Sequence, residues 1–576
     1  MSGYEPVVGT WRVDKGRIAA PNQAILLRLQ KYFLTCLASM SRLYAFLLGA
    51  FEKQYLKEGY ITSLTKLEWR SGLIDDADIV ETAALSQNEN ATQNEPFWRS
   101  QQMKHISTQY INGKFVPSHG TDQFGLVNPS SNTVIGRLSL ADEHDTQDAI
   151  SAAKAAFKDF SKTTRQQRSE CLQQMYDAVI SRSDELIDAV MEEYGAPYPR
   201  AKSATLDAAN NFLAAKEALQ GFEFERSIGK SRVLLEPVGV VGIIIPWNST
   251  YGFICNKLAM AIATGCTAVI KPSEMSGLQV QLLTECLDKA GLAPGVFNIV
   301  TGLGEVVGTE ITRNPDVAKI SFTGSTVVGK MIARGAVDTM KRVTLELGGK
   351  SPNIILDDAD LSKAVPLAIA AGFLNSGQAC IAATRLLVPE KRSAEIKSLI
   401  KSAVEQVKVG DPRTDGVTVG PLVSKKQYER VQTYIQLGID AGAEILVGGL
   451  GHPKGLEAGN FVRPTVFVNV TNDMRIAQEE IFGPVICMLT YKTDEEAIQI
   501  ANDTVYGLQA FVSSTNIERA NRIARQIDAG RVLINFFGTD PLAPFGGFKQ
   551  SGIGREYGVF GFEQYVEPKA LLGDIQ

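Results

Sequence analysis

The sequence predicts an α/β protein in which two parallel sheets, each with connecting helices, form two lobes. Short apolar, β-branched runs alternate with helical segments between residues 240 and 346. Strands that alternate with helices of about 10 to 15 residues imply right-handed crossovers and a parallel sheet. The same alternation resumes after residue 347. In addition, the chain of 576 residues exceeds the length at which one hydrophobic core keeps growing.

Hydrophobic periodicity places the individual elements. Apolar positions three and four apart predict a helical region over 141–219, with long runs over 145–160 and 166–194. The strands predicted in the first unit are 240–245, 268–270, 296–300, 319–322 and 343–345; its helices are 256–263, 278–289, one after Gly304 and one from Thr326. In the second unit we expect helices over 393–407, 425–441 and 517–527, and a closing strand over 562–572.

Residues 1–102 lack this alternation, and we treat them as an extension whose role the sequence does not reveal. Within them, the apolar stretch 32–51 has about the 20 residues needed to cross a bilayer, but Arg42 interrupts it. A packed or interfacial amphipathic helix is therefore favoured, and membrane contact stays an open alternative. No basic segment with a small-residue cleavage site precedes this stretch, so we expect a cytoplasmic protein.

Composition and charge restrict the chemistry. The net charge is −5, and the 58 Lys and Arg residues are distributed along the chain rather than clustered. This distribution argues against nucleic acid as a partner and favours a small-molecule substrate. The seven cysteines show no C-x-x-C spacing, and only four histidines occur. A disulfide framework, a metal site and a histidine triad are therefore not expected, and catalysis must come from Cys, Lys, Glu or Asn.

A first glycine turn, residues 301–308, follows a predicted strand and opens a helix. Backbone amides at such a helix start can face a phosphate group. Gly304 and Gly308 belong to the spacing G-x-G-x-x-x-G, which differs by one residue from the dinucleotide fingerprint. The turn therefore suits either a phosphate contact or a simple strand-to-helix connection.

A second glycine turn, residues 322–330, begins at Phe322 and resembles a Walker A loop. Met331 stands where that loop requires Ser or Thr to hold magnesium, which argues against an NTPase. Gly324 and Ser325 remain at a predicted helix N-terminus, where they are candidates for a pyrophosphate contact.

Charged residues mark the ends of two predicted strands. Lys271 and Glu274 follow the strand 268–270, at the edge where open α/β sheets bind ligands. Both can bind ribose hydroxyls there, and the charge of Glu274 would favour NAD over NADP; the alternative is a solvated ion pair. Glu346 lies between two leucines. Such an acid is either half of a buried structural pair or a base with a raised pKa, and both interpretations stay open.

Cys380 follows a glycine-containing loop. Its small neighbours, among them Ala379 and Ala382, leave room for a substrate at the sulfur. Most lone cysteines are simply buried apolar residues. Taken alone, the position is therefore compatible with either a nucleophile or a packing residue.

Seven motifs occur in the order and approximate spacing of the aldehyde dehydrogenase superfamily, which the sequence resembles from about residue 108 to 572. They are Pro246-Trp247-Asn248, Lys271-Pro-Ser-Glu274, Phe322-Thr-Gly-Ser-Thr326, Leu345-Glu-Leu-Gly-Gly-Lys350, Gly377-Gln-Ala-Cys380, Glu480-Ile-Phe482-Gly-Pro-Val485 and Pro544-Phe-Gly-Gly-Phe-Lys-Gln-Ser-Gly552. The resemblance implies an aldehyde dehydrogenase-like α/β fold. Its expected parts are a Rossmann-type NAD-binding domain (103–222 and 238–346), an α/β catalytic domain (347–545) and a small β oligomerisation element (223–237 and 546–576).

The resemblance also implies a function, namely NAD-dependent oxidation of an aldehyde to a carboxylic acid. Cys380 resembles the nucleophile, Asn248 the amide that stabilises the oxyanion together with the Cys380 backbone N–H, and Glu346 the base that activates water. Lys271 is expected to serve the catalytic set and the cofactor. The cofactor contacts that the resemblance implies are Trp247, Lys271, Glu274, Gly304, Gly308, Phe322, Gly324, Ser325, Glu480 and Phe482. No metal is implied, and family members usually form homodimers or homotetramers.

The sequence also departs from the family pattern. Many members carry an aromatic residue and proline after the motif that ends at Asn248, whereas Ser249, Thr250 and Tyr251 follow here, so we expect an altered wall of the substrate tunnel. Two alternatives stay open: a CoA-acylating aldehyde dehydrogenase, which generally lacks the base at Glu346, and a non-catalytic member, which would be expected to lose the cysteine or the glutamate.

Overall fold

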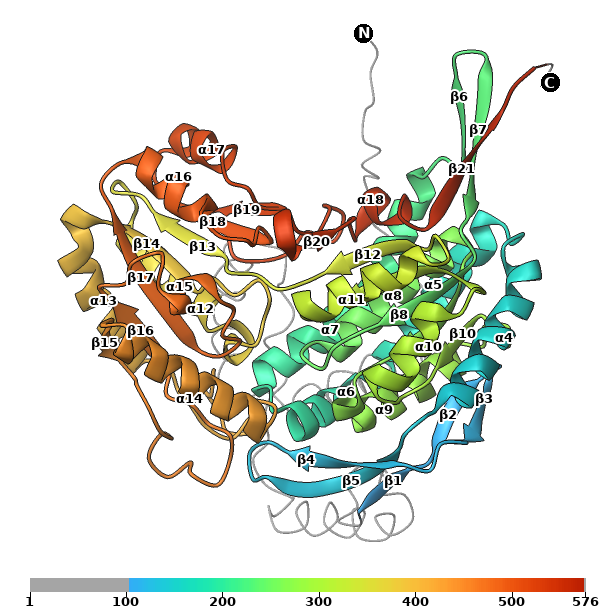
Figure 1. Ribbon diagram of the computed structural model, residues 1–576, viewed down its shortest axis with the longest axis horizontal. Coiled ribbons are helices and arrows are strands. Elements are labelled where there is room, and N and C mark those ends of the chain that lie inside the picture. Colours follow the sequence, from blue (N-terminus) through green and yellow to red (C-terminus); the bar gives the residue numbers. More distant parts are fainter. Residues whose placement is uncertain (1–102, 574–576) are drawn as a thin grey trace, which may run out of the picture. The chain divides into compact units, whose positions relative to one another are not determined.

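The protein, seen in a computed structural model that describes residues 103–573, has a mixed α/β fold built on two large sheets (Figure 1). The predicted fold class is confirmed. The first sheet has the order β20-β12-β11-β8-β9-β10-β2-β3. Its strands are β2 (Thr108–Ile111), β3 (Lys114–Pro117), β8 (Val240–Ile244), β9 (Thr267–Lys271), β10 (Phe297–Ile299), β11 (Val317–Thr323), β12 (Arg342–Glu346) and β20 (Gly552–Ile553). The five central strands are parallel.

Helices cover both faces of this sheet, and the strand sequences reflect it. In β8, Val240 and Ile244 pack into one core with residues of α4 (Glu143–Phe160), α10 (Thr309–Arg313) and α11 (Thr326–Val337). The alternate residues Val241 and Ile243 pack into the opposite core. That core includes residues of α5 (Arg165–Ile180), α7 (Tyr198–Gly221), α8 (Thr250–Thr264) and α9 (Gly277–Lys289). A strand buried on both faces needs apolar residues at consecutive positions, which explains its uninterrupted apolar run.

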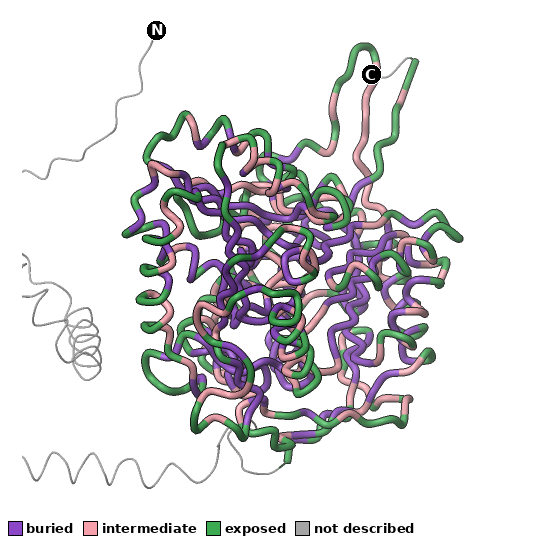
Figure 2. The backbone as a smooth tube through the Cα atoms, turned by 60° about the vertical axis from the view of Figure 1, so that its left-hand side comes forward, coloured by how far each residue is buried: buried purple, intermediate pink, exposed green. Residues whose placement is uncertain are grey.

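The second sheet has the order β15-β16-β17-β14-β13-β18-β19, and only its β15–β16 pair is antiparallel. Its strands are β13 (Pro352–Ile355), β14 (Arg385–Pro389), β15 (Glu444–Val447), β16 (Thr465–Val468), β17 (Val485–Tyr491), β18 (Gln509–Ser513) and β19 (Arg531–Ile534). The helices of this region are α12 (Leu361–Gly372), α13 (Ser393–Glu405), α14 (Lys425–Asp440), α15 (Arg475–Gln478), α16 (Asp494–Asn502) and α17 (Ile517–Ala524). Figure 2 shows that the strands of both large sheets are mostly buried.

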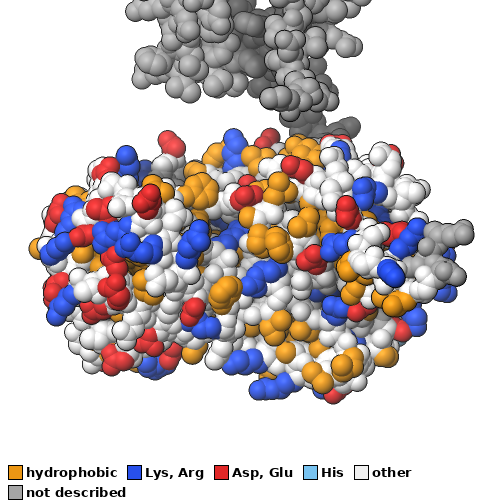
Figure 3. Space-filling model, turned by 90° about the horizontal axis from the view of Figure 1, so that it is seen from above, with side chains coloured by type: hydrophobic (Ala, Val, Ile, Leu, Met, Phe, Trp, Pro, Cys, Tyr) orange, Lys and Arg blue, Asp and Glu red, His pale blue; other side chains and the backbone are white. Residues whose placement is uncertain are grey.

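Two three-stranded sheets complete the described chain. One contains β1 (Lys104–Ile106), β4 (Gln123–Asn128) and β5 (Thr133–Ser139); the other contains β6 (Glu225–Ile228), β7 (Ser231–Pro237) and β21 (Val566–Leu571). β21 follows the short helix α18 (Gly558–Phe562) and pairs with β7 over residues 232–237. Figure 3 shows that the surface seen from above carries hydrophobic side chains among charged ones. The exposed apolar residues in or near β20 and α18 are Phe548, Ile553, Val559 and Phe560.

Three local predictions need correction. The run 166–194 is not one helix: it divides into α5, α6 (Ser183–Ala189) and a π-helical turn, Val190–Tyr194. The division falls at Arg182, whose backbone leaves helical geometry (φ −124°, ψ 24°). The segment after Gly304 begins as a π-helical turn, Gly304–Gly308, before α10. The closing strand is confirmed only over Val566–Leu571, because Phe562 ends α18 and residues 563–565 form a turn.

The apolar stretch 32–51 lies outside the described residues. Between residues 103 and 573, each helix is too short or too polar to cross a membrane.

Candidate active site

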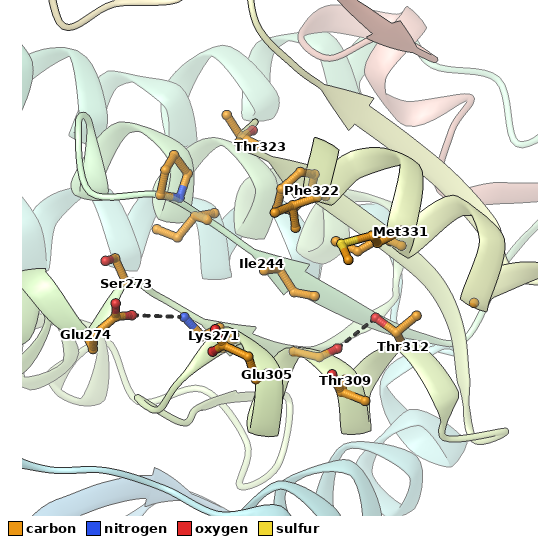
Figure 4. A pocket seen from close by; sticks show the side chains of 18 of the residues that line it. Ile244, Lys271, Ser273, Glu274, Glu305, Thr309, Thr312, Phe322, Thr323 and Met331 are labelled. Atoms are coloured by element: carbon orange, nitrogen blue, oxygen red, sulfur yellow. Dashed lines mark hydrogen bonds and ion pairs between the residues drawn. The ribbon is translucent and has the colours of Figure 1, made fainter. Parts of the chain in front are cut away.

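A cavity of about 670 Å³ lies at the carboxyl ends of β8, β9 and β11 (Figure 4). In the first sheet, β9 lies next to β8 and β10 lies next to β9. The following strand, β11, lies on the opposite side of β8, so the strand order reverses there. Ligands of open α/β sheets bind at this reversal of strand order. The volume is within the range of about 300 to 1,000 Å³ that is usual for small-molecule sites.

Six of the predicted cofactor residues line this cavity: Lys271, Glu274, Gly304, Gly308, Phe322 and Gly324. Glu274 is oriented toward Lys271 in Figure 4, and Lys271 Nζ lies 3.5 Å from Glu274 Oε2. Burial lowers the pKa of Lys271, and the charge of Glu274 opposes that shift. Otherwise the walls are largely apolar, with Ile244, Met331 and Ile332 among them.

Ser325 has a local structural contact. It is the N-cap of α11, and its hydroxyl accepts a hydrogen bond from the backbone N–H of Val328 at 3.4 Å. It follows Gly324 directly but does not line the cavity.

A strained loop carries Cys380 toward the second sheet. After α12, Asn375, Ser376 and Gly377 adopt left-handed backbone conformations in succession, with φ of 57°, 57° and 74°. A Cβ atom on Gly377 would lie 2.1 Å from the carbonyl carbon of Gly483. Glycine is therefore required at Gly377, both for the sign of φ and for the close approach of the two backbones.

Amide side chains hold this loop. Asn248 Nδ2 donates to the carbonyl oxygen of Gln378 at 2.9 Å. Asn375 Nδ2 donates to the carbonyl oxygens of Asn248 at 2.9 Å and Gln378 at 3.3 Å. Gln378 donates in turn to the hydroxyl of Tyr194 at 3.2 Å and accepts from the backbone N–H of Val423 at 3.0 Å. Gln378, two residues before Cys380, is thus held both by residues next to the first sheet and by residues next to the second.

Glu346 ends β12 and is buried, with 2% of its surface exposed. Neither of its carboxylate oxygens has a hydrogen-bond partner among the described residues. Burial raises its pKa well above the usual range, and repulsion from Glu556 adds to the shift. A buried polar group without a partner in a native structure is unusual and suggests a site for water or a ligand.

Glu480 and the ring of Phe482 lie on the segment that precedes β17. Glu480 Oε1 accepts from the backbone N–H of Gly349 at 3.0 Å, and burial raises the pKa of Glu480 to about 7. Phe482 has a positive φ of 65°, and its ring meets Trp247 edge to face at a centroid distance of 5.5 Å. Contacts of Glu480 and Phe482 thus connect the second sheet to segments that follow β12 and β8.

Lys257 and Glu556 are residues near Glu346 that the sequence analysis missed. They form a buried ion pair, and Asn256 Nδ2 donates to the other oxygen of Glu556 at 2.9 Å. Lys257 is completely buried. Its position as the only charged residue of the largely apolar helix α8 is the sequence signal that could have revealed it, since a buried lysine requires a partner.

The charges of two carboxylates, Glu480 and Glu346, act on the thiol of Cys380. Burial raises the pKa of its thiol to about 12, and the charges of Glu480 and Glu346 contribute to the shift. A Cβ atom on Gly349 would lie 2.2 Å from the carbonyl oxygen of Cys380. The loop from Asn375 to Cys380, called the thiol loop below, therefore packs directly against the segment that follows Glu346.

The predicted catalytic and cofactor residues form two adjoining sites. Cys380, Asn248 and Glu346 do not line the cavity, and neither do Trp247, Glu480 and Phe482. Backbone connections link the two sites: Trp247 and Asn248 directly follow Pro246, which lines the cavity, and Gly324 N–H donates to the Glu346 carbonyl at 3.0 Å. Among residues 103–573, no group of His, Cys, Asp and Glu is arranged to hold a metal ion.

Comparisons with known proteins identify the family. Residues 115–571 match the model of the aldehyde dehydrogenase family. A 3-succinoylsemialdehyde-pyridine dehydrogenase from a Pseudomonas species is 45% identical over 473 residues, which cover 82% of this chain and 99% of that protein. The chain belongs to the aldehyde dehydrogenase family, as its motifs predicted.

Two solved structures illustrate the likeness. Mutant aldehyde dehydrogenase C from Pseudomonas syringae, in complex with NAD⁺ and octanal, aligns with a TM-score of 0.80 and 42% identity, covering 82% of this chain and 98% of that one. An NAD⁺ complex of an aldehyde dehydrogenase from Bacillus cereus aligns with a TM-score of 0.80 and 37% identity, covering 84% and 99%.

The raised pKa of Cys380 predicts its reactivity in the cofactor-free protein. Only the thiolate is alkylated, so the rate of reaction with iodoacetamide should rise by about tenfold per pH unit from pH 8 to pH 10. The rate is measured by mass spectrometry of the peptide that contains Cys380, with glutathione in the same solution as a control thiol. A rate for Cys380 that levels off below pH 9 would contradict the prediction.

Proposed function

We propose that this protein oxidises an aldehyde to a carboxylic acid with NAD as hydride acceptor, through a thioester on Cys380. The observation that carries the proposal is the position of a thiol, a side-chain amide and an unpartnered buried carboxylate beside a cofactor-sized cavity. The NAD⁺ complexes of the two structural relatives support the choice of cofactor.

The cavity residues fit the adenosine end of NAD. Its largely apolar walls suit a flat base, and Lys271 and Glu274 provide a donor and an acceptor for ribose hydroxyls. Gly304 and Gly308 have open space where a Cβ would lie, so the backbone at the start of this turn is accessible. Glu274 would repel a 2′-phosphate, which makes NADP the less suitable cofactor. NAD, when bound, accepts the hydride.

In the first step, the Cys380 thiol transfers its proton to water, the sulfur bonds to the aldehyde carbon, and the carbonyl oxygen becomes an oxyanion. Asn248 Nδ2 carries two hydrogens, of which one is directed to Gln378. The other N–H, together with the Cys380 backbone N–H, stabilises the oxyanion. Loss of hydride from the same carbon restores the carbonyl and leaves a thioester. Glu480 and Phe482 position the nicotinamide end.

In the second step, Glu346 removes a proton from water, which attacks the thioester carbon. The acid is released, and the sulfur leaves as a thiolate. A raised pKa suits a carboxylate for this proton transfer near neutral pH. Lys257 and Asn256 hold Glu556 in place, and the charge of Lys257 opposes the upward shift in the pKa of Glu346.

The experiment that tests the proposal is incubation of the full chain with NAD and a panel of aldehydes, with and without CoA. NADH formation without CoA, together with release of the free acid, supports the hydrolytic reaction. A strict requirement for CoA would indicate an acylating enzyme instead. No NADH from any aldehyde would indicate a non-catalytic member.

Replacement of the nucleophile should separate chemistry from binding. Cys380→Ala is expected to abolish NADH production and to leave NAD affinity within about twofold of wild type, because Cys380 does not line the cavity. Stopped assays and NAD titration by fluorescence measure the two effects. Cys171→Ala, at another half-buried cysteine, is the matched control. Wild-type turnover in Cys380→Ala would refute the assignment.

Glu346→Gln should stop the cycle at the thioester. We expect a burst of about one NADH per subunit and then a steady-state rate lower by roughly 100-fold or more, since a general base contributes about 10² to 10⁴. Rapid-mixing absorbance at the NADH band measures the burst. Glu429→Gln, at an exposed glutamate on α14, is the control. An unimpaired steady state would exclude Glu346 as the base.

We also propose that the protein is a homo-oligomer. Among the described strands, β21 pairs with β7 only, so its other edge is open to a second copy. Ile228, at the end of β6 in the same sheet, and Leu572, directly after β21, are 60% and 77% exposed. Light scattering on the purified full chain measures the mass, and a monomer at micromolar concentration would contradict the proposal.

A further inference from the structure

Arg200, in the first turn of α7, is a guanidinium near the thiol loop without a carboxylate partner. Its Nε donates to Asn375 Oδ1 at 3.5 Å, and no ion pair of Arg200 occurs among residues 103–573. The side chain is half-buried. Buried or partly buried arginines are normally paired, so this one calls for an explanation.

The surroundings place Arg200 beside the proposed oxyanion site. It lines a cavity of about 20 Å³ together with Tyr194, Trp247, Asn248, Ser249 and Asn375. This volume holds about one water and no larger group. The residue as a whole is nevertheless of intermediate exposure, so Arg200 is not sealed from solvent.

Arg200 is also close to the reacting centre. Its partner Asn375 donates to the carbonyl oxygen of Gln378 at 3.3 Å, and Gln378 precedes Cys380 by two residues. Ser249 is the first of the residues at which the sequence departs from many family members. Ser249 lines the same small cavity as Arg200, at a position where many family members carry an aromatic ring.

The local electrostatics favour an added anion. Burial lowers the pKa of Arg200, while the charges of Tyr194 and Asp207 raise it. Because the lowering by burial is larger, nearby negative charge does not fully compensate for the positive charge of Arg200. Asp207 lies two turns further along α7 and is exposed to solvent. An arginine fork binds a carboxylate through two parallel hydrogen bonds, and such charged hydrogen bonds are stronger than neutral ones.

We propose that Arg200 binds an anionic group on the aldehyde, so that short aldehydes with a terminal carboxylate are the favoured substrate class. This inference rests on the proposed function, because it concerns the same thiol and the same aldehyde. Arg200 and Asn248 line the same small cavity, so an aldehyde whose carboxylate reaches Arg200 while its carbonyl oxygen reaches Asn248 has to be short. A cationic aldehyde, such as the one named in the betaine aldehyde dehydrogenase that is 34% identical to this chain, would be repelled.

The test compares substrates of equal length and different charge. We expect wild-type enzyme to have a higher kcat/KM for 4-oxobutanoate and 5-oxopentanoate than for butanal and pentanal, and the lowest for betaine aldehyde. In Arg200→Met, the ratio of kcat/KM for the oxo acid to that for the alkanal should fall by roughly 10- to 100-fold, which corresponds to one charged hydrogen bond. The change should appear mainly in KM.

Two further variants sharpen the comparison. Arg200→Lys keeps the positive charge and should retain part of the preference for the oxo acids. Lys202→Met, at an exposed residue on the same helix, should leave the ratio unchanged. Should Arg200→Met not fold, inhibition of wild-type butanal oxidation by glutarate, compared with glutaramide, provides a second measurement, and stronger inhibition by glutarate is expected.

The outcomes separate the inference from the function on which it rests. A wild-type preference for alkanals would overturn it, and so would equal inhibition by glutarate and glutaramide. An equal loss on both substrates in Arg200→Met would assign Arg200 to positioning Asn375 instead. If no aldehyde gives NADH, the proposed function itself fails, whereas oxidation of alkanals alone contradicts only the role of Arg200.

Discussion

Close backbone packing around the Cys380 loop is the constraint on which the site depends. Gly377 approaches the carbonyl of Gly483, and Gly349 approaches the carbonyl of Cys380, at distances that leave no room for a side chain. The first contact joins the thiol loop to the segment of Glu480 and Phe482, and the second joins it to the segment that follows Glu346. Three remote parts of the chain are therefore held together by their backbones, which move less than side chains.

A second constraint is the cost of burying charge so close to the thiol. Glu346 and Glu556 repel each other, and Lys257 compensates for part of that repulsion. A buried ion pair gives little net stability, because desolvation of both ions offsets their attraction. Removal of one partner is costly, however, since it leaves the other charge unpaired. The pair thus fixes the position of Glu556, and its two charges shift the pKa of Glu346 in opposite directions, Glu556 upward and Lys257 downward.

The sequence was informative where local pattern determines structure. Apolar runs predicted the central strands of the first sheet, because strands buried on both faces require consecutive apolar residues. The position of Lys271 and Glu274 at the end of β9 was predictable as well, since ligand sites in parallel sheets occur at strand ends. The break in 166–194 was missed because periodicity continues across it; the turn depends on Arg182, whose side chain bonds to Glu185 and to the distant Glu285.

Contacts between distant segments could not be predicted in this way. Lys257 and Glu556 are 299 residues apart, and no local pattern indicates that one needs the other. The same holds for Arg200 and Asn375, which are 175 residues apart. The residues assigned to the chemistry lie in motifs that a family resemblance can identify. Ser249 lies where this chain departs from many family members, and Arg200 lies outside the seven motifs, so their surroundings had to come from the three-dimensional structure. The proposed reaction thus depends on the backbone packing around Cys380, whereas the proposed choice of aldehyde depends on a side chain, Arg200, that contacts this packing through Asn375.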